Sequence, residues 1–220
     1  MQQVKNGDTI QVHYHGKLTT GETFDSIAKL ADYSIHERCT SNNFDWKNSS
    51  CIPPTLSYLK LNGFDELGDS FLLHQQLPNL LELNLDASKH FSDLSIPLLP
   101  AHLTGLNLDS SSKISGKSFE FLPRCLLRLH LDSSKSIFDS DIQHLPRTLK
   151  HVELNRAIHL TELCIADLPP HLEYLSMLQN SKISSSSFPN FPYSLRSHKF
   201  STAVSFKRWK SEWGKVREMI

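Results

Sequence analysis

A short run in which leucines alternate with polar residues recurs along most of this chain at a fixed interval. Successive copies begin 24 residues apart once and 23 residues apart thereafter, at Leu56, Leu80, Leu103, Leu126, Leu149, Leu172 and Leu195. Alternation with a period of two is the pattern of a short strand that buries one face. The sequence therefore predicts six to seven copies of one strand-containing unit, the last of them degraded.

The second half of each unit carries two further apolar positions, eleven and sixteen residues after the first leucine. They are Phe91, Ile114, Ile137, Leu160 and Ile183, and Ile96, Phe119, Ile142, Ile165 and Phe188. This wider spacing predicts a helical or 3-10 turn, which a Leu-Pro pair ends because proline cannot continue a helix. One unit cannot bury its own apolar face, so neighbouring units must stack and share a core. The expected fold is an α/β solenoid of short parallel strands and helical turns.

The segments "DSSSKISGKSF" and "DSSKSIFDSDI" place an isoleucine three residues after a fixed small polar position. With the repeated Leu-x-x-Leu-x-Leu run, they resemble the leucine-rich repeat family, most closely its cysteine-containing subclass, over residues 54 to 201. The family usually has Asn or Cys at that position, where this chain has Ser88, Ser111, Ser134 and Ala157, and only Asn180 matches. A hydroxyl bonds neighbouring backbone less completely than an amide, so we expect a looser ladder.

The resemblance implies that the strands line a concave face on which the polar residues between the leucines point outward. We expect a protein-interaction scaffold that binds a protein or peptide there and needs no cofactor. The candidate partner-binding residues are Tyr58, Glu82, Asp86, Asp109, Arg128, His130, Asp132, His151, Glu153 and Tyr174. Because no nucleophile elbow or glycine-rich phosphate loop is present, the repeats give no confident catalytic residue.

One column of this face is rich in carboxylates, with Asn62, Asp86, Asp109, Asp132 and Asn155 in equivalent positions. Adjacent strands would place them about 4.8 Å apart, and like charges at that spacing raise one another's pKa. One interpretation is that each side chain ends a strand and accepts hydrogen bonds from backbone amides of the following turn. The other is an acidic stripe that binds a basic segment of a partner, with Tyr58 and Tyr174 as anchors.

The N-terminal stretch "NGDTIQVHYHGKLTTGETFDSI" has a different pattern, a half-buried strand framed by Asn-Gly and Thr-Gly turn signals. It resembles the FKBP family of peptidyl-prolyl isomerases over residues 4 to 27. The resemblance implies that Tyr14, Phe24 and Asp25 correspond to pocket-lining residues of that family. The family's pocket floor and aromatic rim have no counterpart in the chain, so isomerase activity is the alternative function rather than the preferred one.

Four segments follow from these patterns: residues 1–27 form a truncated FKBP-like β fragment, and 28–52 a linker or degenerate cap that begins with a short helix. Residues 53–201 form the repeats, and 202–220 a C-terminal helix or cap. Three explanations of the first segment stay open: a remnant of a gene fusion, a chimeric gene model, or a strand that caps the exposed edge of the first repeat.

The C-terminal segment spaces Phe206, Trp209, Trp213, Val216 and Ile220 three and four residues apart, which predicts an amphipathic helix with a basic opposite face. Such a helix would seal the last repeat, because solenoids need capped ends. The alternative is that residues 206–220 dock on a partner or a membrane surface.

Charge and cysteine content narrow the classes of protein to which the chain can belong. Lys plus Arg and Asp plus Glu are both 23, so no net field favours nucleic acid. No run of about 18 apolar residues and no leader pattern is present, which predicts a cytoplasmic protein without a transmembrane segment. The four cysteines show no disulfide or paired zinc-ligand spacing. We therefore predict no metal site.

Overall fold

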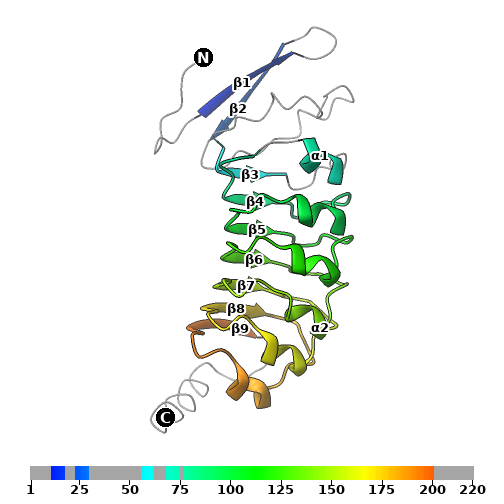
Figure 1. Cartoon of the computed structure of the whole chain (residues 1–220), viewed down its shortest axis with the longest axis vertical. Coiled ribbons are helices and arrows are strands. Elements are labelled where there is room, and N and C mark those ends of the chain that lie inside the picture. Colours follow the sequence, from blue (N-terminus) through cyan, green and yellow to red (C-terminus); the bar gives the residue numbers. More distant parts are fainter. Residues whose placement is uncertain (1–10, 18–22, 30–55, 62–67, 75–76, 201–220) are drawn as a thin grey trace.

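The computed structural model describes residues 11–17, 23–29, 56–61, 68–74 and 77–200. These residues form a two-stranded antiparallel sheet and a seven-stranded parallel sheet. The first contains β1 (Gln11–Lys17) and β2 (Thr23–Lys29). The second stacks strands in chain order, and short helices line the opposite side of the stack (Figure 1).

Within the described residues, each of the first six repeats contributes one strand and one short helix, and the seventh contributes a strand. The strands are β3 (Tyr58–Lys60), β4 (Glu82–Asn84), β5 (Gly105–Asn107), β6 (Arg128–His130), β7 (His151–Glu153), β8 (Tyr174–Met177) and β9 (Ser197–Phe200). The helices are α1 (Asp69–His74), η3 (Asp93–Leu98), η4 (Gly116–Phe121), α2 (Asp139–Ile142), η5 (Glu162–Asp167) and η6 (Ser185–Asn190), of which the η elements are 3-10. The degraded seventh copy therefore still forms a strand.

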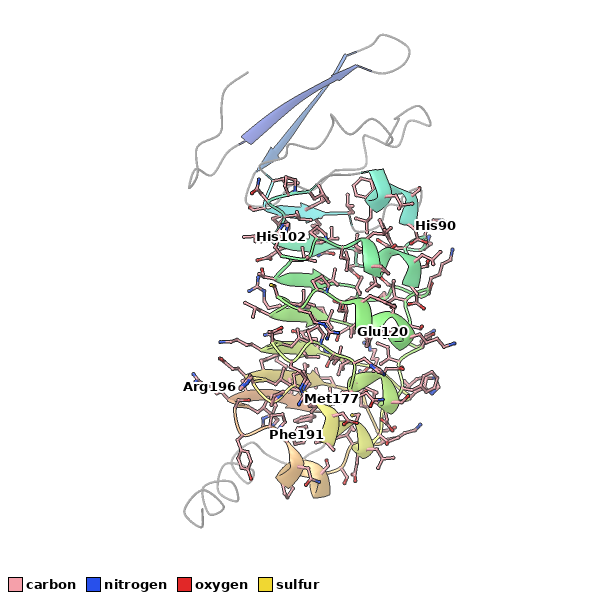
Figure 2. All side chains as sticks on the ribbon, viewed as in Figure 1. His90, His102, Glu120, Met177, Phe191 and Arg196 are labelled. Atoms are coloured by element: carbon pink, nitrogen blue, oxygen red, sulfur yellow. The ribbon has the colours of Figure 1, made fainter. Side chains whose placement is uncertain are left out.

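The core lies between the strand layer and the helix layer, and side chains fill this space along the whole stack (Figure 2). All seven leading leucines are buried. The apolar positions eleven residues later are buried in every copy from Phe91 to Ile183, and those sixteen residues later from Ile96 to Ile165. The alternating and wider spacings thus predicted the core correctly, because each repeat can remove these side chains from water only against its neighbours.

Proline ends three of the 3-10 helices in the way that the sequence predicts. Leu99, Leu122 and Leu168 each follow a 3-10 helix, precede a proline, and have ψ between 142° and 146°. The ring of the following proline excludes the helical conformation at these residues. The proline carbonyl then accepts a hydrogen bond from the leading leucine of the next repeat, for example Leu103 N to Pro100 O at 3.0 Å.

A row of non-glycine residues with positive φ follows the strands. Ala87, Ser110, Ser133, Arg156 and Gln179 have φ between 56° and 61°. The left-handed region costs an L-residue about 1–2 kcal/mol. The first four each donate their N–H to a carbonyl of the next repeat at 2.7–2.8 Å, as Ser110 does to Asp132. Inter-repeat bonding therefore holds a conformation that local preference opposes.

An acid-hydroxyl ladder joins the helix starts of successive repeats, and the sequence patterns did not reveal it. The Asp93 carboxylate accepts from Ser115 N at 2.7 Å, from Ser115 Oγ at 2.6 Å and from Ser118 Oγ at 2.9 Å. The same arrangement links Asp69 to Ser92 and Ser95, Asp139 to Thr161, and Glu162 to Ser184. Each acid begins a helix, where the dipole favours negative charge.

The ladder is interrupted between η4 and α2. Gly116 stands where the acid would be, and Phe138 stands where the hydroxyl would be. Asp141 instead turns back and accepts from Phe138 N at 2.8 Å. Its carboxylate occupies the space that a Cβ at Gly116 would need, so glycine is the residue compatible with this local cap.

The first two predicted segments need one correction. β2 continues to Lys29, so the short helix expected to begin at residue 28 is wrong for Ala28 and Lys29, which pair with Val12 and Gln11 in the hairpin. Pairing with β1 holds these residues in an extended conformation. Residues 30–55 and 201–220 lie outside the described residues. They include the rest of the 28–52 segment and the whole C-terminal segment 202–220.

Candidate functional site

The outward residues of β3 to β9 form one continuous surface, called here the strand face. Parallel register aligns equivalent positions, so Arg128, His151 and Tyr174 share one column and His130 and Glu153 share the next. The residues between these columns are buried leucines or valine. The alternation of a strand therefore brings the predicted partner-binding residues of β3, β4, β6, β7 and β8 onto the same side of the sheet.

His130, His151 and Glu153 come together on β6 and β7, and we name these three residues the His-Glu cluster. His151 Nε2 lies 3.2 Å from Glu153 Oε1, and His130 Nδ1 lies 3.7 Å from Glu153 Oε2. The side chains are 29%, 32% and 23% exposed in the order given, so solvent reaches all of them. The two imidazoles stack with ring centroids 5.4 Å apart.

Aromatic stacking extends this cluster toward the last strands. The His151 ring lies 4.0 Å from the Tyr174 ring at an interplanar angle of 13°. Lys199 Nζ lies 5.9 Å from the centroid of the same tyrosine, within the range of a cation-π interaction. Because Tyr174 is half-buried between its neighbours, it presents a rigid, partly apolar surface among charged groups.

An ion pair spans β4 and β6 across the intervening strand. Arg128 Nη2 lies 2.5 Å from Glu82 Oε1, and both side chains are 42% exposed. A Cβ at Gly105 would lie 3.2 Å from Glu82 and 3.3 Å from Arg128, so glycine leaves room for the pair to cross β5. At this exposure the pair contributes about 0–1 kcal/mol to stability. Its main consequence is to neutralise two of the predicted binding residues.

The carboxylate-rich column of Asp86, Asp109, Asp132 and Asn155 is called here the aspartate column. Side chains of this column accept hydrogen bonds from the next repeat. Asp109 Oδ1 accepts from Asp132 N at 2.7 Å, and Asp132 Oδ1 accepts from Asn155 N at 2.8 Å. Asn155 continues the row by accepting from Leu178 N at 2.6 Å. For Asp109, Asp132 and Asn155, the interpretation that these side chains accept from backbone amides is confirmed, but the expected location of the amides was wrong. The amides belong to the same position of the next repeat, because stacking places it closer than the following turn.

Burial raises the pKa of Asp109 to about 6, and the Asp132 and Asp86 carboxylates add to the rise against the hydrogen bond from Asp132 N and the nearby His130. The effect of like charges that the sequence predicted is thus present at Asp109, second to burial. A raised pKa in the folded protein means that this group stabilises the fold fully below pH 4, and that the contribution is lost as pH rises through 6.

We expect Asp109→Asn to raise the unfolding midpoint in urea at pH 7.5 and to leave it nearly unchanged at pH 4. Asparagine keeps the oxygen that accepts from Asp132 N but carries no charge, as Asn155 already shows in the same column. Denaturation of both proteins between pH 4 and 8 measures the difference. Asp167→Asn, at an exposed position of η5, is the control. An equal gain at both pH values would contradict the prediction.

No protein-family model and no curated protein matches the chain. The leucine-rich repeat-containing protein LegL7 from Legionella pneumophila has a similar structure, with a TM-score of 0.51 and 16% sequence identity. The match covers 76% of this chain and 62% of LegL7. The fold is a leucine-rich repeat solenoid. A chain from the structure of the yeast Rad7 and Elc1 complex matches with a TM-score of 0.41 and 15% identity, over 77% of this chain and 69% of that chain.

The small polar ladder of the leucine-rich repeats is looser where serine replaces the usual amide, as predicted. Ser88 Oγ and Ser111 Oγ donate to backbone carbonyls at 3.5 Å and 3.3 Å. Asn180 Nδ2 donates to Leu154 O at 2.9 Å. The shorter hydroxyl side chain reaches the carbonyl less well, and these residues act in the fold rather than in a site.

The two described cysteines of the repeats, Cys125 and Cys164, differ in exposure. Cys164 is fully buried in the core, and burial raises the pKa of its thiol to about 12. The thiol is therefore protonated at neutral pH and a poor nucleophile. Cys125 is exposed and free, whereas Cys39 and Cys51 lie outside the described residues.

The FKBP-like residues lie on the hairpin before the repeats. The register places Tyr14 opposite Ser26, Phe24 opposite Gly16 and Asp25 opposite His15. The isomerase interpretation of this segment stays a prediction.

Within the described part of the chain, no helix is both long enough and apolar enough to cross a membrane.

The strand pattern predicts His130, His151 and Glu153 as binding residues, but it did not predict that all three come together. His130 and Glu153 are separated by one repeat length, and His151 lies two residues before Glu153. This spacing was a usable signal, because one repeat length means adjacent strands and two residues mean the same face. It needed the strand register to become a spatial statement.

Proposed function

We propose that this protein is an interaction scaffold that binds a basic segment of a partner protein on the strand face, over β4 to β7. The observation that carries the proposal is the distribution of charge. Five half-buried carboxylates lie there: Glu82 and Glu153 on β4 and β7, and Asp86, Asp109 and Asp132 two residues after β4, β5 and β6. The arginine of this region, Arg128, pairs with Glu82, which leaves the other four acidic. Lys60 and Lys199 lie at the two ends of the described sheet, so the acidic surface is central.

A basic partner fits this surface for two physical reasons. Opposite charge increases the association rate and sets the register of the complex. The pKa of the Asp109 carboxyl group is raised to about 6 in the free protein. A cation beside this group would favour its ionised form. Binding should therefore strengthen between pH 5 and pH 7. Tyr174 provides an aromatic anchor at the edge of the acidic region.

A random-sequence peptide library displayed on phage tests the proposal with the full chain as bait. We expect the enriched peptides to contain several Lys or Arg residues and to bind at least tenfold more weakly to the Asp86→Lys and Tyr174→Ala variants. Matched controls are Glu120→Lys and Asp167→Lys, which reverse exposed acidic positions in η4 and η5. Figure 2 shows Glu120 on the helix side of the stack.

Three results would overturn the proposal. Enriched peptides without basic residues would show that the acidic surface does not select the ligand. Equal binding to the strand-face and helix-side variants, or no enrichment over a library panned without bait, would show that the strand face is not a peptide-binding surface.

A further inference from the structure

The His-Glu cluster brings together the side-chain types that bind late transition metals. One nitrogen of each imidazole and one oxygen of the carboxylate lie within 4.8 Å of one another. Imidazole is a preferred ligand of zinc, copper and nickel, and a carboxylate commonly completes such sets. We propose that His130, His151 and Glu153 form a binding site for a divalent metal ion of the zinc type, distinct from the aspartate column.

The distances between ligand atoms suit a zinc ion. Zinc binds imidazole nitrogen and carboxylate oxygen at about 2.0–2.2 Å in a tetrahedron, which places ligand atoms roughly 3.3 Å apart. The two distances from Glu153 oxygens to histidine nitrogens are 3.2 Å and 3.7 Å, one on each side of that value. An ion between these groups would replace these two nitrogen–oxygen contacts with three coordinate bonds, with little change in backbone.

One side-chain movement is required. A metal lies in the plane of each imidazole that binds it, whereas the two rings are stacked with an interplanar angle of 23°. One imidazole must therefore turn about its Cβ–Cγ bond. Exposed fractions of 29% and 32% leave space for this rotation on the solvent side. The backbone of β6 and β7, fixed by the sheet register, holds the three Cα positions in place.

Three protein ligands leave the fourth tetrahedral position open to solvent. Structural zinc sites fill all four positions from the protein, whereas sites that exchange ligands keep one for water or another molecule. This cluster belongs to the second type, and a His, Cys or carboxylate side chain of a bound protein could occupy the fourth position. The site adds a metal-dependent contact to the strand face, and metal binding itself needs no partner.

Zinc titration of the full chain against a competing chromophoric chelator measures the affinity. We expect one site whose affinity falls at least tenfold in each of His130→Ala, His151→Ala and Glu153→Gln. His144→Asn is the matched control, since that histidine is exposed on the helix side of the same repeat. A His13→Asn and His15→Asn double variant controls for the two N-terminal histidines spaced two residues apart.

Cobalt provides an independent readout of geometry. Co²⁺ bound by two imidazoles and a carboxylate should give visible absorption bands typical of four or five ligands, and the bands should disappear in the three cluster variants. Circular dichroism of each variant checks that it remains folded. Absence of a stoichiometric zinc site, or equal affinity in the cluster variants and the wild type, would overturn the proposal. Loss of the site in either control would do the same.

This test is separable from that of the proposed function. Asp86→Lys alters peptide binding without touching a ligand of the cluster, and zinc titration is done without peptide. A protein that binds basic peptides but no zinc would refute the metal site alone. A protein that binds zinc but no peptide would refute the peptide-binding proposal alone.

Discussion

Replacing Phe119 by alanine is expected to lower the free energy of unfolding by about 3–5 kcal/mol, as removal of a fully buried aromatic ring usually does. Phe119 is 0% exposed and lies in η4, which packs between η3 and α2. Equivalent positions in the adjacent repeats hold Ile96 and Ile142, both buried. Because each is fixed in its own stacked repeat, neither can move far enough to close the cavity.

The control for this substitution lies two residues further on. Phe121→Ala removes the same ring from the same helix, but Phe121 is 55% exposed, so we expect a change below about 1 kcal/mol. Urea denaturation followed by circular dichroism measures both. The Phe119 variant should also show a broader transition, because weakening a central repeat uncouples the two halves of a solenoid. Similar losses for the two variants would contradict the assigned core.

Asp93→Ala is expected to lower the free energy of unfolding by about 2–4 kcal/mol, through three lost hydrogen bonds rather than through packing. The carboxylate accepts from Ser115 N, Ser115 Oγ and Ser118 Oγ of the next repeat. Ser118 is 3% exposed, but its Oγ keeps an acceptor in Ser115 O at 3.1 Å, so the loss falls mainly on the two donors of Ser115. Asp93→Asn should lose less, because its remaining oxygen can still accept from Ser115 N.

Denaturant titration of the two Asp93 variants tests this order. Asp167→Ala serves as the control, because that side chain is exposed and lies at the end of η5, outside the ladder. A loss for Asp93→Ala no larger than that of Asp167→Ala would mean that the ladder does not couple neighbouring repeats. Equal losses of stability for Asp93→Ala and Asp93→Asn would contradict the role given to the hydrogen bond that Ser115 N donates.

The first member of the ladder adds a pH dependence. Burial alone would raise the pKa of Asp69, but hydrogen bonds from Ser92 and Ser95 outweigh it and hold the pKa below its usual value of 3.8. A lowered pKa contributes stability above pH 4 that is lost as pH falls. Asp109 has the opposite sign, with its pKa raised to about 6. These two carboxylates thus respond to pH in opposite directions, because burial outweighs the hydrogen bond at Asp109 whereas several hydrogen bonds outweigh burial at Asp69.

The ladder also shows where sequence patterns stop being informative. Asp93 and Ser115 are 22 residues apart, close to the repeat length. Without knowing where each helix begins, that spacing does not distinguish a bonded pair from two solvent-exposed residues. The interruption at Gly116 and Phe138 is even harder to predict from the sequence, because it depends on the direction in which the Asp141 side chain turns.

The sequence by itself determined the repeat, its length, the buried positions and the parallel order of the strands. A side chain that must leave water imposes a period on the sequence. The 23-residue period of the leucines therefore predicts the stack of repeats. The tertiary structure decided what the polar residues do. Whether Asp109 bonds its own turn or the next repeat, and whether His130 meets Glu153, depends on register and on distances of a few ångströms between strands. Hydrogen bonds and ligand sets are directional and short-ranged, so they follow from the stacking of the repeats and leave little trace in hydrophobic periodicity.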